Sequence, residues 1–225
     1  MNLFDILGPV MVGPSSSHTA GAVRIGLVAR KLLEEDPVKA DILLHGSFAT
    51  TGVGHGTDKA LIAGLLGMEP DDMRIPGSFE EAKKKGLSFY FHTGSLKDAH
   101  PNTALLTLTG RNGRQMSVQA ASIGGGRISI RKLDGIEVNF SAEKPTLVVR
   151  NLDTPGQVAE VTGKLSLEKV NIATMQLYRD KRNGCAVMVL ETDQSIPEES
   201  VEAIRSLQGI LQVIYINTEE NRDGV

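Results

Sequence analysis

The spacing of apolar and polar positions divides the chain into alternating helices and strands. Apolar residues three or four apart predict helices, and alternating or short unbroken apolar runs predict strands. Helices are predicted at 20–35, 58–67, 78–85, 157–169 and 197–206, with a helical turn at 3–7. Strands are predicted at 41–47, 87–92, 104–110, 115–123, 127–133, 136–140, 146–150, 172–179, 185–191 and 210–217.

The order of these elements indicates two domains of different construction. The first mixes helices with strands, including a hairpin around the Asp134-Gly135 turn. Residues 141–145 form the boundary, and a single strand–helix–strand–strand–helix–strand cycle follows. The sequence therefore predicts an α+β chain. An N-terminal mixed α/β, substrate-binding-like domain spans residues 1–142, and a βαββαβ (ferredoxin-like) domain spans residues 146–219.

Composition excludes several classes of function. The chain has 225 residues, a net charge of -3, no Trp and 4% aromatic residues, so it lacks the basic field and the stacking surface that nucleic-acid binding uses. It contains no run of about 20 apolar residues and no N-terminal secretory signal, and we expect a cytoplasmic protein. The single cysteine, Cys185, lies in an apolar run where burial is expected, and alone it can form neither an internal disulfide nor a thiolate cluster.

A loop rich in hydroxyl groups precedes the first long helix. Residues 13–19 read GPSSSHT. The side-chain donors of this loop are Ser15, Ser16, Ser17, His18 and Thr19. Because the first N–H groups of a helix have no internal partner and its dipole favours negative charge, we interpret the loop as an anion site. The alternative is a turn with a Ser N-cap, although three serines followed by His exceed what a cap needs.

A second polar loop with a histidine also leads into a helix. His55 lies between glycines in TGVGHGTDKA, residues 51–60, and Thr57 or Asp58 is the expected N-cap. Glycines widen the accessible backbone, so His55 is a candidate base on a mobile loop. An exposed loop histidine without a chemical role is the alternative.

Two further features have weaker chemical interpretations. His100 begins the sequence HPNT, beside hydroxyl and amide groups, where Pro101 also favours an ordinary turn. Ser17 and His18 raise the possibility of a hydrolase. Adjacent residues rarely adopt the geometry of nucleophile and base, and no G-x-S-x-G sequence is present, so the hydrolase is disfavoured.

The C-terminal domain resembles an ACT domain, a small βαββαβ module that often binds amino acids. The match lies in LVVRNLDTPGQVAEVTGKLSLEKVNIATMQLYR, residues 147–179. The resemblance implies ligand contacts at Asp153, Pro155, Gly156, Asn171 and Ile172, and a homodimer formed through paired ACT domains. Independently of the resemblance, a glycine at a helix N-terminus lets a carboxylate approach the backbone N–H groups.

The N-terminal domain resembles the beta chain, or beta domain, of the bacterial iron–sulfur L-serine dehydratases. The motifs are LFDILGPVMVGPSSSHTAGAVRIG, LHGSFATTGVGHGTDKALIAGLLG, HPNT and SIGGGRI. The resemblance implies a two-chain lyase, an L-serine ammonia-lyase that converts L-serine into pyruvate and ammonia. It places a [4Fe-4S] cluster on a partner alpha subunit, and we predict no metal ligand on this chain.

The same resemblance implies roles for the two polar loops. His55 is the expected base and His18 a substrate binder, with the reverse assignment open. The expected substrate-binding residues are Ser15, Ser16, Ser17, Thr19, Thr57, Asp58 and Lys59. The alternative function is a stand-alone regulatory module that binds an amino acid and is related to the substrate-binding domain of phosphoglycerate dehydrogenases.

Overall fold

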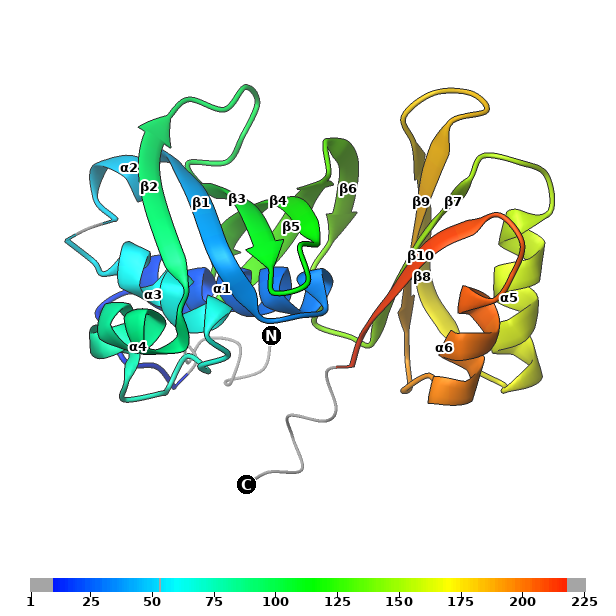
Figure 1. Cartoon of the computed structure of the whole chain (residues 1–225), viewed down its shortest axis with the longest axis horizontal. Coiled ribbons are helices and arrows are strands. Elements are labelled where there is room, and N and C mark those ends of the chain that lie inside the picture. The colour runs from blue at the N-terminus through cyan, green and yellow to red at the C-terminus, as the bar shows by residue number, and fades with distance from the viewer. Residues whose placement is uncertain (1–9, 53, 218–225) are drawn as a thin grey trace. The chain divides into compact units, whose positions relative to one another are not determined.

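The computed structural model describes residues 10–52 and 54–217 and divides the chain into two compact units, residues 1–135 and 136–225 (Figure 1). The helical turn expected at 3–7 lies outside the described residues. The helices are η2 (Ser16–Ala20), α1 (Gly21–Leu33), α2 (Ser47–Thr50), α3 (Thr57–Leu65), η3 (Ile75–Gly77), α4 (Ser78–Lys85), α5 (Gln157–Leu167) and α6 (Glu198–Arg205).

The strands confirm the predicted order. They are β1 (Pro37–Gly46), β2 (Ser88–Gly94), β3 (Asn102–Gly110), β4 (Gln115–Gly124), β5 (Arg127–Leu133), β6 (Ile136–Phe140), β7 (Thr146–Leu152), β8 (Ile172–Arg179), β9 (Cys185–Thr192) and β10 (Ile210–Ile216). Strand β1 begins earlier than predicted, at Pro37, where the missing N–H of proline is tolerated at the start of a strand. The mixed α/β fold class with a second sheet is confirmed.

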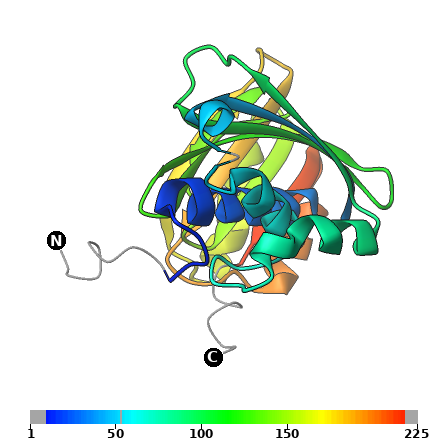
Figure 2. The ribbon, with the colours of Figure 1, turned by 90° about the vertical axis from the view of Figure 1, so that its left-hand side faces the viewer.

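The first sheet has the strand order β2-β1-β3-β4-β5-β6. Strand β1 pairs in parallel with β2 and antiparallel with β3, so it is an inner strand with a neighbour on each side. Helix α1 contacts β3, β4 and β5, and α3 packs on α1. Figure 2 shows α1, α3 and α4 on the same side of this sheet, so these three described helices leave its other face uncovered.

Two glycines allow α1 and α3 to cross at very short range. A Cβ at Gly26 would collide with the Leu61 carbonyl, and one at Gly64 would collide with the Val23 carbonyl. A side chain larger than hydrogen at either position would therefore force the two helices apart. Apolar side chains between the helices and the sheet, such as Ile25 and Leu106, are fully buried.

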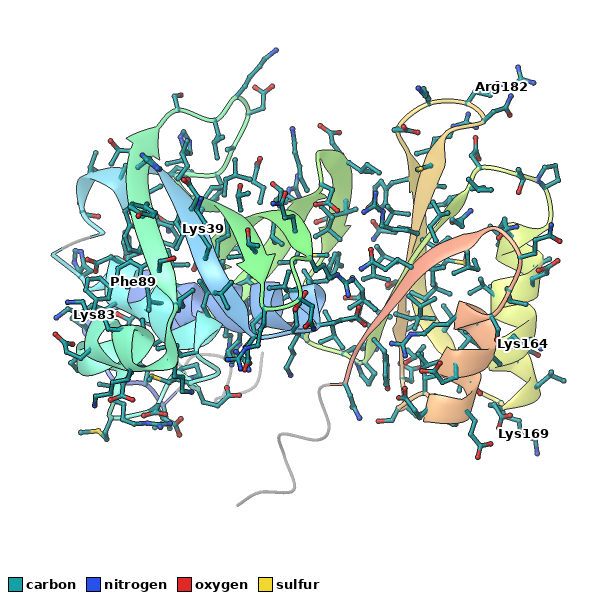
Figure 3. The ribbon with its side chains drawn as sticks, viewed as in Figure 1. Lys39, Lys83, Phe89, Lys164, Lys169 and Arg182 are labelled. Carbon is teal, nitrogen blue, oxygen red and sulfur yellow. The ribbon has the colours of Figure 1, made fainter. Side chains whose placement is uncertain are left out.

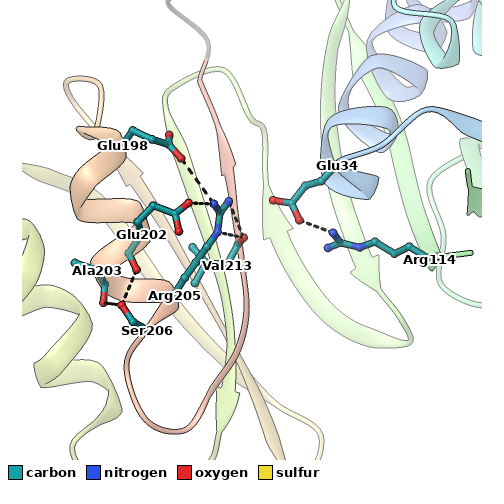
Figure 4. Close-up of polar contacts among 8 residues, drawn as sticks. All are labelled: Glu34, Arg114, Glu198, Glu202, Ala203, Arg205, Ser206 and Val213. Atoms are coloured by element: carbon teal, nitrogen blue, oxygen red, sulfur yellow. Dashed lines mark hydrogen bonds and ion pairs between the residues drawn. The ribbon is translucent and has the colours of Figure 1, made fainter. Parts of the chain in front are cut away.

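The ends of α1 and α4 are fixed by polar and aromatic contacts. Glu34 follows α1 in a left-handed conformation and accepts a hydrogen bond from Arg114 at 2.5 Å (Figure 4). Phe79 of α4 stacks on Phe89 of the edge strand β2, with ring centroids 4.8 Å apart. Figure 3 shows Phe89 beside α4, while Lys83 on the same helix projects outward, as expected for a solvated face.

The second unit contains an antiparallel sheet with the order β10-β7-β9-β8. Its element order, β7-α5-β8-β9-α6-β10, confirms the predicted βαββαβ cycle. The core includes Leu147, Val161 and Met188, all 0% exposed. Arg205 of α6 pairs with Glu202 and donates to the Val213 carbonyl of β10, which fastens the last helix to the sheet (Figure 4).

Among the described helices, none combines the length and the apolar character that a membrane span needs.

Candidate active site

The GPSSSHT loop enters α1 through a π-helical turn, η2. Ser15 is the N-cap, and its hydroxyl accepts a hydrogen bond from the His18 N–H at 3.1 Å. Gly13 has a φ of +142°, and a Cβ there would collide with the Thr19 side chain, so this entry requires glycine. π-Helical turns are rare and occur often at functional sites. The Ser N-cap considered above is therefore confirmed, and the anion site stays a prediction.

The imidazole of His18 is held at both nitrogens by hydroxyl groups. Its Nε2 lies 3.0 Å from Ser47 Oγ and 3.1 Å from Thr51 Oγ1. Its Nδ1 lies 3.2 Å from Ser17 Oγ and 3.5 Å from Ser15 Oγ. The GPSSSHT loop and the segment after β1 therefore meet at one histidine ring.

The hydrogen bonds of Thr51 define the tautomer of His18. The Thr51 hydroxyl donates to the Ser47 carbonyl at 2.9 Å, so its oxygen acts as an acceptor toward other groups. His18 Nε2 then carries the proton shared with Thr51 Oγ1, and in the neutral ring Nδ1 accepts from Ser17. Both nitrogens of His18 are thus engaged within the protein.

His55 has the opposite tautomer. Its Nδ1 lies 2.9 Å from the Thr51 carbonyl, which can only accept a hydrogen bond, so Nδ1 carries the proton. In the neutral ring the lone pair then lies on Nε2, and the His55 side chain is exposed. The His55 ring centroid is 5.0 Å from that of His18. The site therefore presents one imidazole lone pair next to a hydroxyl-lined turn.

Burial and the neighbouring histidine lower the pKa of His18. Desolvation of the half-buried ring has the larger effect, and repulsion by a protonated His55 adds to it. An interaction with the backbone of Ser47 raises the pKa but does not overcome these two effects. His18 is consequently neutral near pH 7, in agreement with the tautomer that its partners define.

Two buried threonines connect the polar loops. The hydroxyl of Thr57 donates to the His18 carbonyl at 3.0 Å, and that of Thr19 donates to the His55 carbonyl at 3.3 Å. Thr57 does not cap α3 with its side chain, because the N-cap is Gly56, with a φ of +70° and no side-chain hydrogen bond. Both threonine hydroxyls hold the loops together and point to backbone carbonyls.

The other predicted substrate residues lie around this core with different contacts. The carbonyl of Ser16 accepts from the Gly21 N–H. Asp58 also fails as the predicted cap and instead accepts from the Lys59 N–H at 2.8 Å. The Lys59 carbonyl accepts from Ser78 at 2.8 Å, and the side chains of Asp58 and Lys59 are half-buried.

The sequence interpretation did not identify Ser47 and Thr51, which contact His18 directly. They lie in the segment SFATT, part of which forms the short helix α2. Gly46 precedes this helix with a φ of +57°, and the Pro101 carbonyl of HPNT accepts from the Ser47 N–H at 2.8 Å. The available signal was a group of hydroxyl residues directly after a buried strand.

The predicted ACT-domain ligand residues fall into two groups. Asp153, Pro155 and Gly156 precede α5, and the Asp153 carboxylate accepts from the Asn183 N–H at 3.1 Å. Asn171 and Ile172 follow the other end of α5 and line a cavity of about 630 Å³. The structure therefore brings the two residues of the second group to one cavity, at the opposite end of α5 from the first group.

The residues of this chain do not fit an iron–sulfur cluster. Such clusters are held by several Cys thiolates, and the sequence has one cysteine, Cys185, which lies half-buried on β9. Within residues 10–52 and 54–217, no three His, Cys, Asp or Glu side chains gather as a metal site. A cluster would need ligands from another chain.

The fold and the site define a two-domain chain that carries an imidazole–hydroxyl site in a mixed α/β domain and ends in a βαββαβ domain. The family model described as "Serine dehydratase beta chain" matches residues 2–86, and the ACT domain model matches residues 146–209. The first match contains both polar loops.

Curated relatives match almost the whole chain. A "Probable L-serine dehydratase, beta chain" from Bacillus subtilis (strain 168) is 40% identical over 96% of this chain and 97% of its own length. An "L-serine dehydratase, beta chain" from Peptoniphilus asaccharolyticus is 38% identical over 95% of this chain and 96% of its own length. A D-3-phosphoglycerate dehydrogenase from Bacillus subtilis (strain 168) is 25% identical over 87% of this chain but only 37% of its own length. The chain belongs to the family of L-serine dehydratase beta chains.

Proposed function

We propose that this chain is the beta subunit of an L-serine dehydratase and contributes substrate-binding and acid–base residues to the deamination of L-serine. The opposed tautomers of His18 and His55 carry this proposal, because they leave one lone pair, on His55 Nε2, for proton abstraction. The family membership of the chain supports the substrate class.

The reaction removes the Cα proton and the β-hydroxyl of L-serine. We assign the Cα proton to His55 Nε2, the nitrogen that the Thr51 carbonyl leaves unprotonated. Loss of the hydroxyl as water gives aminoacrylate, which tautomerises to an imine and is hydrolysed to pyruvate and ammonia. We propose that a [4Fe-4S] cluster belongs to the alpha subunit, since the described part of this chain has no suitable ligands.

The substrate carboxylate is assigned to the turn at Ser15, Ser16 and Ser17. The first amide groups of the helix beginning at Ser16 have no intrahelical acceptor and attract negative charge. The hydroxyl of Ser17 is shared with His18 Nδ1 at 3.2 Å, which fixes its direction. His18, with both nitrogens engaged, orients these hydroxyls.

The test is anaerobic co-expression of this chain with its alpha subunit, followed by assay of pyruvate formed from L-serine. We expect activity only when both chains are present. A Ser16→Ala variant should raise the KM for L-serine by about tenfold, the effect of losing one good hydrogen bond to a charged group. If a complex whose cluster is spectroscopically intact forms no pyruvate, the proposal is wrong, and the regulatory amino-acid-binding module becomes the better explanation.

A further inference from the structure

A cavity of about 300 Å³ lies on the face of the first sheet that the helices leave uncovered. On β4, Ser122 lies against Gly21 of α1, so the even-numbered residues of this strand face the helices. Gln119 and Ala121 point to the opposite face and line the cavity together with Thr103 of β3. The cavity is therefore separated from the His18 site by the sheet itself.

The floor of this cavity contains an amide group whose polar atoms are open to the cavity. Gln119 is 8% exposed, and its side chain makes no hydrogen bond to another residue in the described part of the chain. Thr103 beside it is 1% exposed. An amide offers both a donor and an acceptor, so a ligand in the cavity can accept from the Gln119 nitrogen and donate to its oxygen.

The exposed residues around the floor provide charges of both signs. His100 Nδ1 accepts from the Asn102 N–H at 3.1 Å, so in the neutral ring Nε2 is a hydrogen-bond donor. Arg131 lines the cavity as a cation, and Asp98 lines it as an anion. Ile123, 46% exposed, supplies an apolar wall.

We propose that this cavity binds a free amino acid. The α-carboxylate is received by Arg131 and His100, the ammonium group by Asp98, and the amide of Gln119 contacts the polar atoms between them. The volume is at the lower end of the range for small-molecule sites, which suits a single amino acid rather than a nucleotide. The proposal does not rest on the dehydratase activity, because binding requires only this chain.

The connection between the two sites is short. Pro101 follows His100 directly, and its carbonyl accepts from the Ser47 N–H, whose hydroxyl contacts His18. Occupation of the cavity can therefore influence the position of Ser47 through one peptide segment.

The test is calorimetric titration of the full chain with each standard amino acid in turn, and with pyruvate. L-Alanine and pyruvate are a matched pair, because they share the carboxylate and the methyl group and differ at the ammonium group. The titrations are repeated in a Ser16→Ala background, which weakens the GPSSSHT site. We expect at least one amino acid to bind in this background, and pyruvate to bind at least about tenfold more weakly than L-alanine.

Two variants locate the binding. Gln119→Leu and Arg131→Gln should each weaken the binding of that amino acid by about tenfold or more. Arg127→Gln, on the same strand as Arg131, should leave the binding unchanged. Because Arg131 is exposed, Arg131→Gln keeps the test valid if Gln119→Leu does not fold. The proposal is overturned if no amino acid binds, or if binding survives both cavity variants unchanged.

Discussion

At the scale of single residues, Thr51 determines the chemistry of both histidines. Its carbonyl accepts from His55 Nδ1, and its hydroxyl accepts from His18 Nε2. Two similar imidazoles, with ring centroids 5.0 Å apart, thereby carry their protons on different nitrogens. His18 is neutral and engaged at both nitrogens, whereas His55 retains an available lone pair. Our proposal that His55 is the base, a choice open at the level of sequence, rests on which backbone and side-chain oxygens surround each ring.

Replacement of His55 by glutamine tests this assignment. The glutamine side chain is polar and of similar size, but it has no lone pair of suitable basicity. We expect His55→Gln to lower kcat for L-serine by about 10²–10⁴-fold, the usual contribution of a general base, with little change in KM. Steady-state kinetics of the assembled enzyme measure both constants. His92→Gln, an exposed histidine on β2, is the matched control and should retain full activity. An equal loss in both variants would remove His55 from the mechanism.

The lowered pKa of His18 makes stability dependent on pH. The unfolded chain binds a proton at His18 near the usual pKa of about 6.5, whereas the folded chain binds it only at lower pH. In the interval between these two pKa values the unfolded state holds more protons, so the free energy of unfolding falls as pH falls. Above the pKa of His18 in the unfolded chain, neither state holds this proton, and His18 no longer contributes to the pH dependence.

Urea unfolding at about pH 7 and about pH 5.5 measures this effect. We expect His18→Asn to reduce the loss of stability between the two pH values, even though it also lowers stability at neutral pH. If His18→Asn leaves the difference in the free energy of unfolding between the two pH values unchanged, His18 is not the titrating group.

At the scale of elements, local patterns predicted nearly every helix and strand, while the part of the site built by distant contacts was not predictable. The periodicity at 20–35 and 58–67 reflects burial on one helix face, which is a local property of the sequence. Helix α2 is different, because its start is fixed by the Pro101 carbonyl on a segment far along the chain. Ser47 and Thr51 were missed for this reason, whereas His18 and His55 were visible from residue type alone.

The crossing of α1 and α3 gives a prediction at this scale. Gly26→Ala would place a methyl group against the Leu61 carbonyl, and the helices would have to separate. We expect a loss of about 1–3 kcal/mol in the free energy of unfolding, typical of overpacking. Gly163→Ala is the matched control, because Gly163 lies exposed within α5 with no atom near its missing Cβ. It should stabilise the chain by about 0.5–1 kcal/mol through helix propensity. Chemical denaturation compares the two, and equal effects would contradict the close crossing.

At the scale of the whole molecule, the chain consists of two compact units, and the second has a hydrophobic core of its own. The first carries the imidazole–hydroxyl site and the uncovered cavity. The second is an ACT domain, whose sheet ends in the edge strands β8 and β10. An exposed edge offers free backbone groups for pairing with another copy of the chain. On β10 the Val213 carbonyl already binds Arg205, so β8 is the better pairing edge.

The homodimer that we expect through the ACT domains should therefore depend on β8. Leu177 on this strand is 50% exposed, and Leu211 on β10 is 52% exposed, so the two positions form a matched pair. We expect Leu177→Asp to weaken dimerisation about thirtyfold, as the loss of a central interface contact of about 2 kcal/mol would do. Leu211→Asp should leave the dimer unchanged. Sedimentation equilibrium of the full chain over a range of concentrations measures both constants. A dimer that Leu211→Asp disrupts and Leu177→Asp does not would place the interface at the opposite edge, and a monomer at all concentrations would leave dimerisation to the partner subunit.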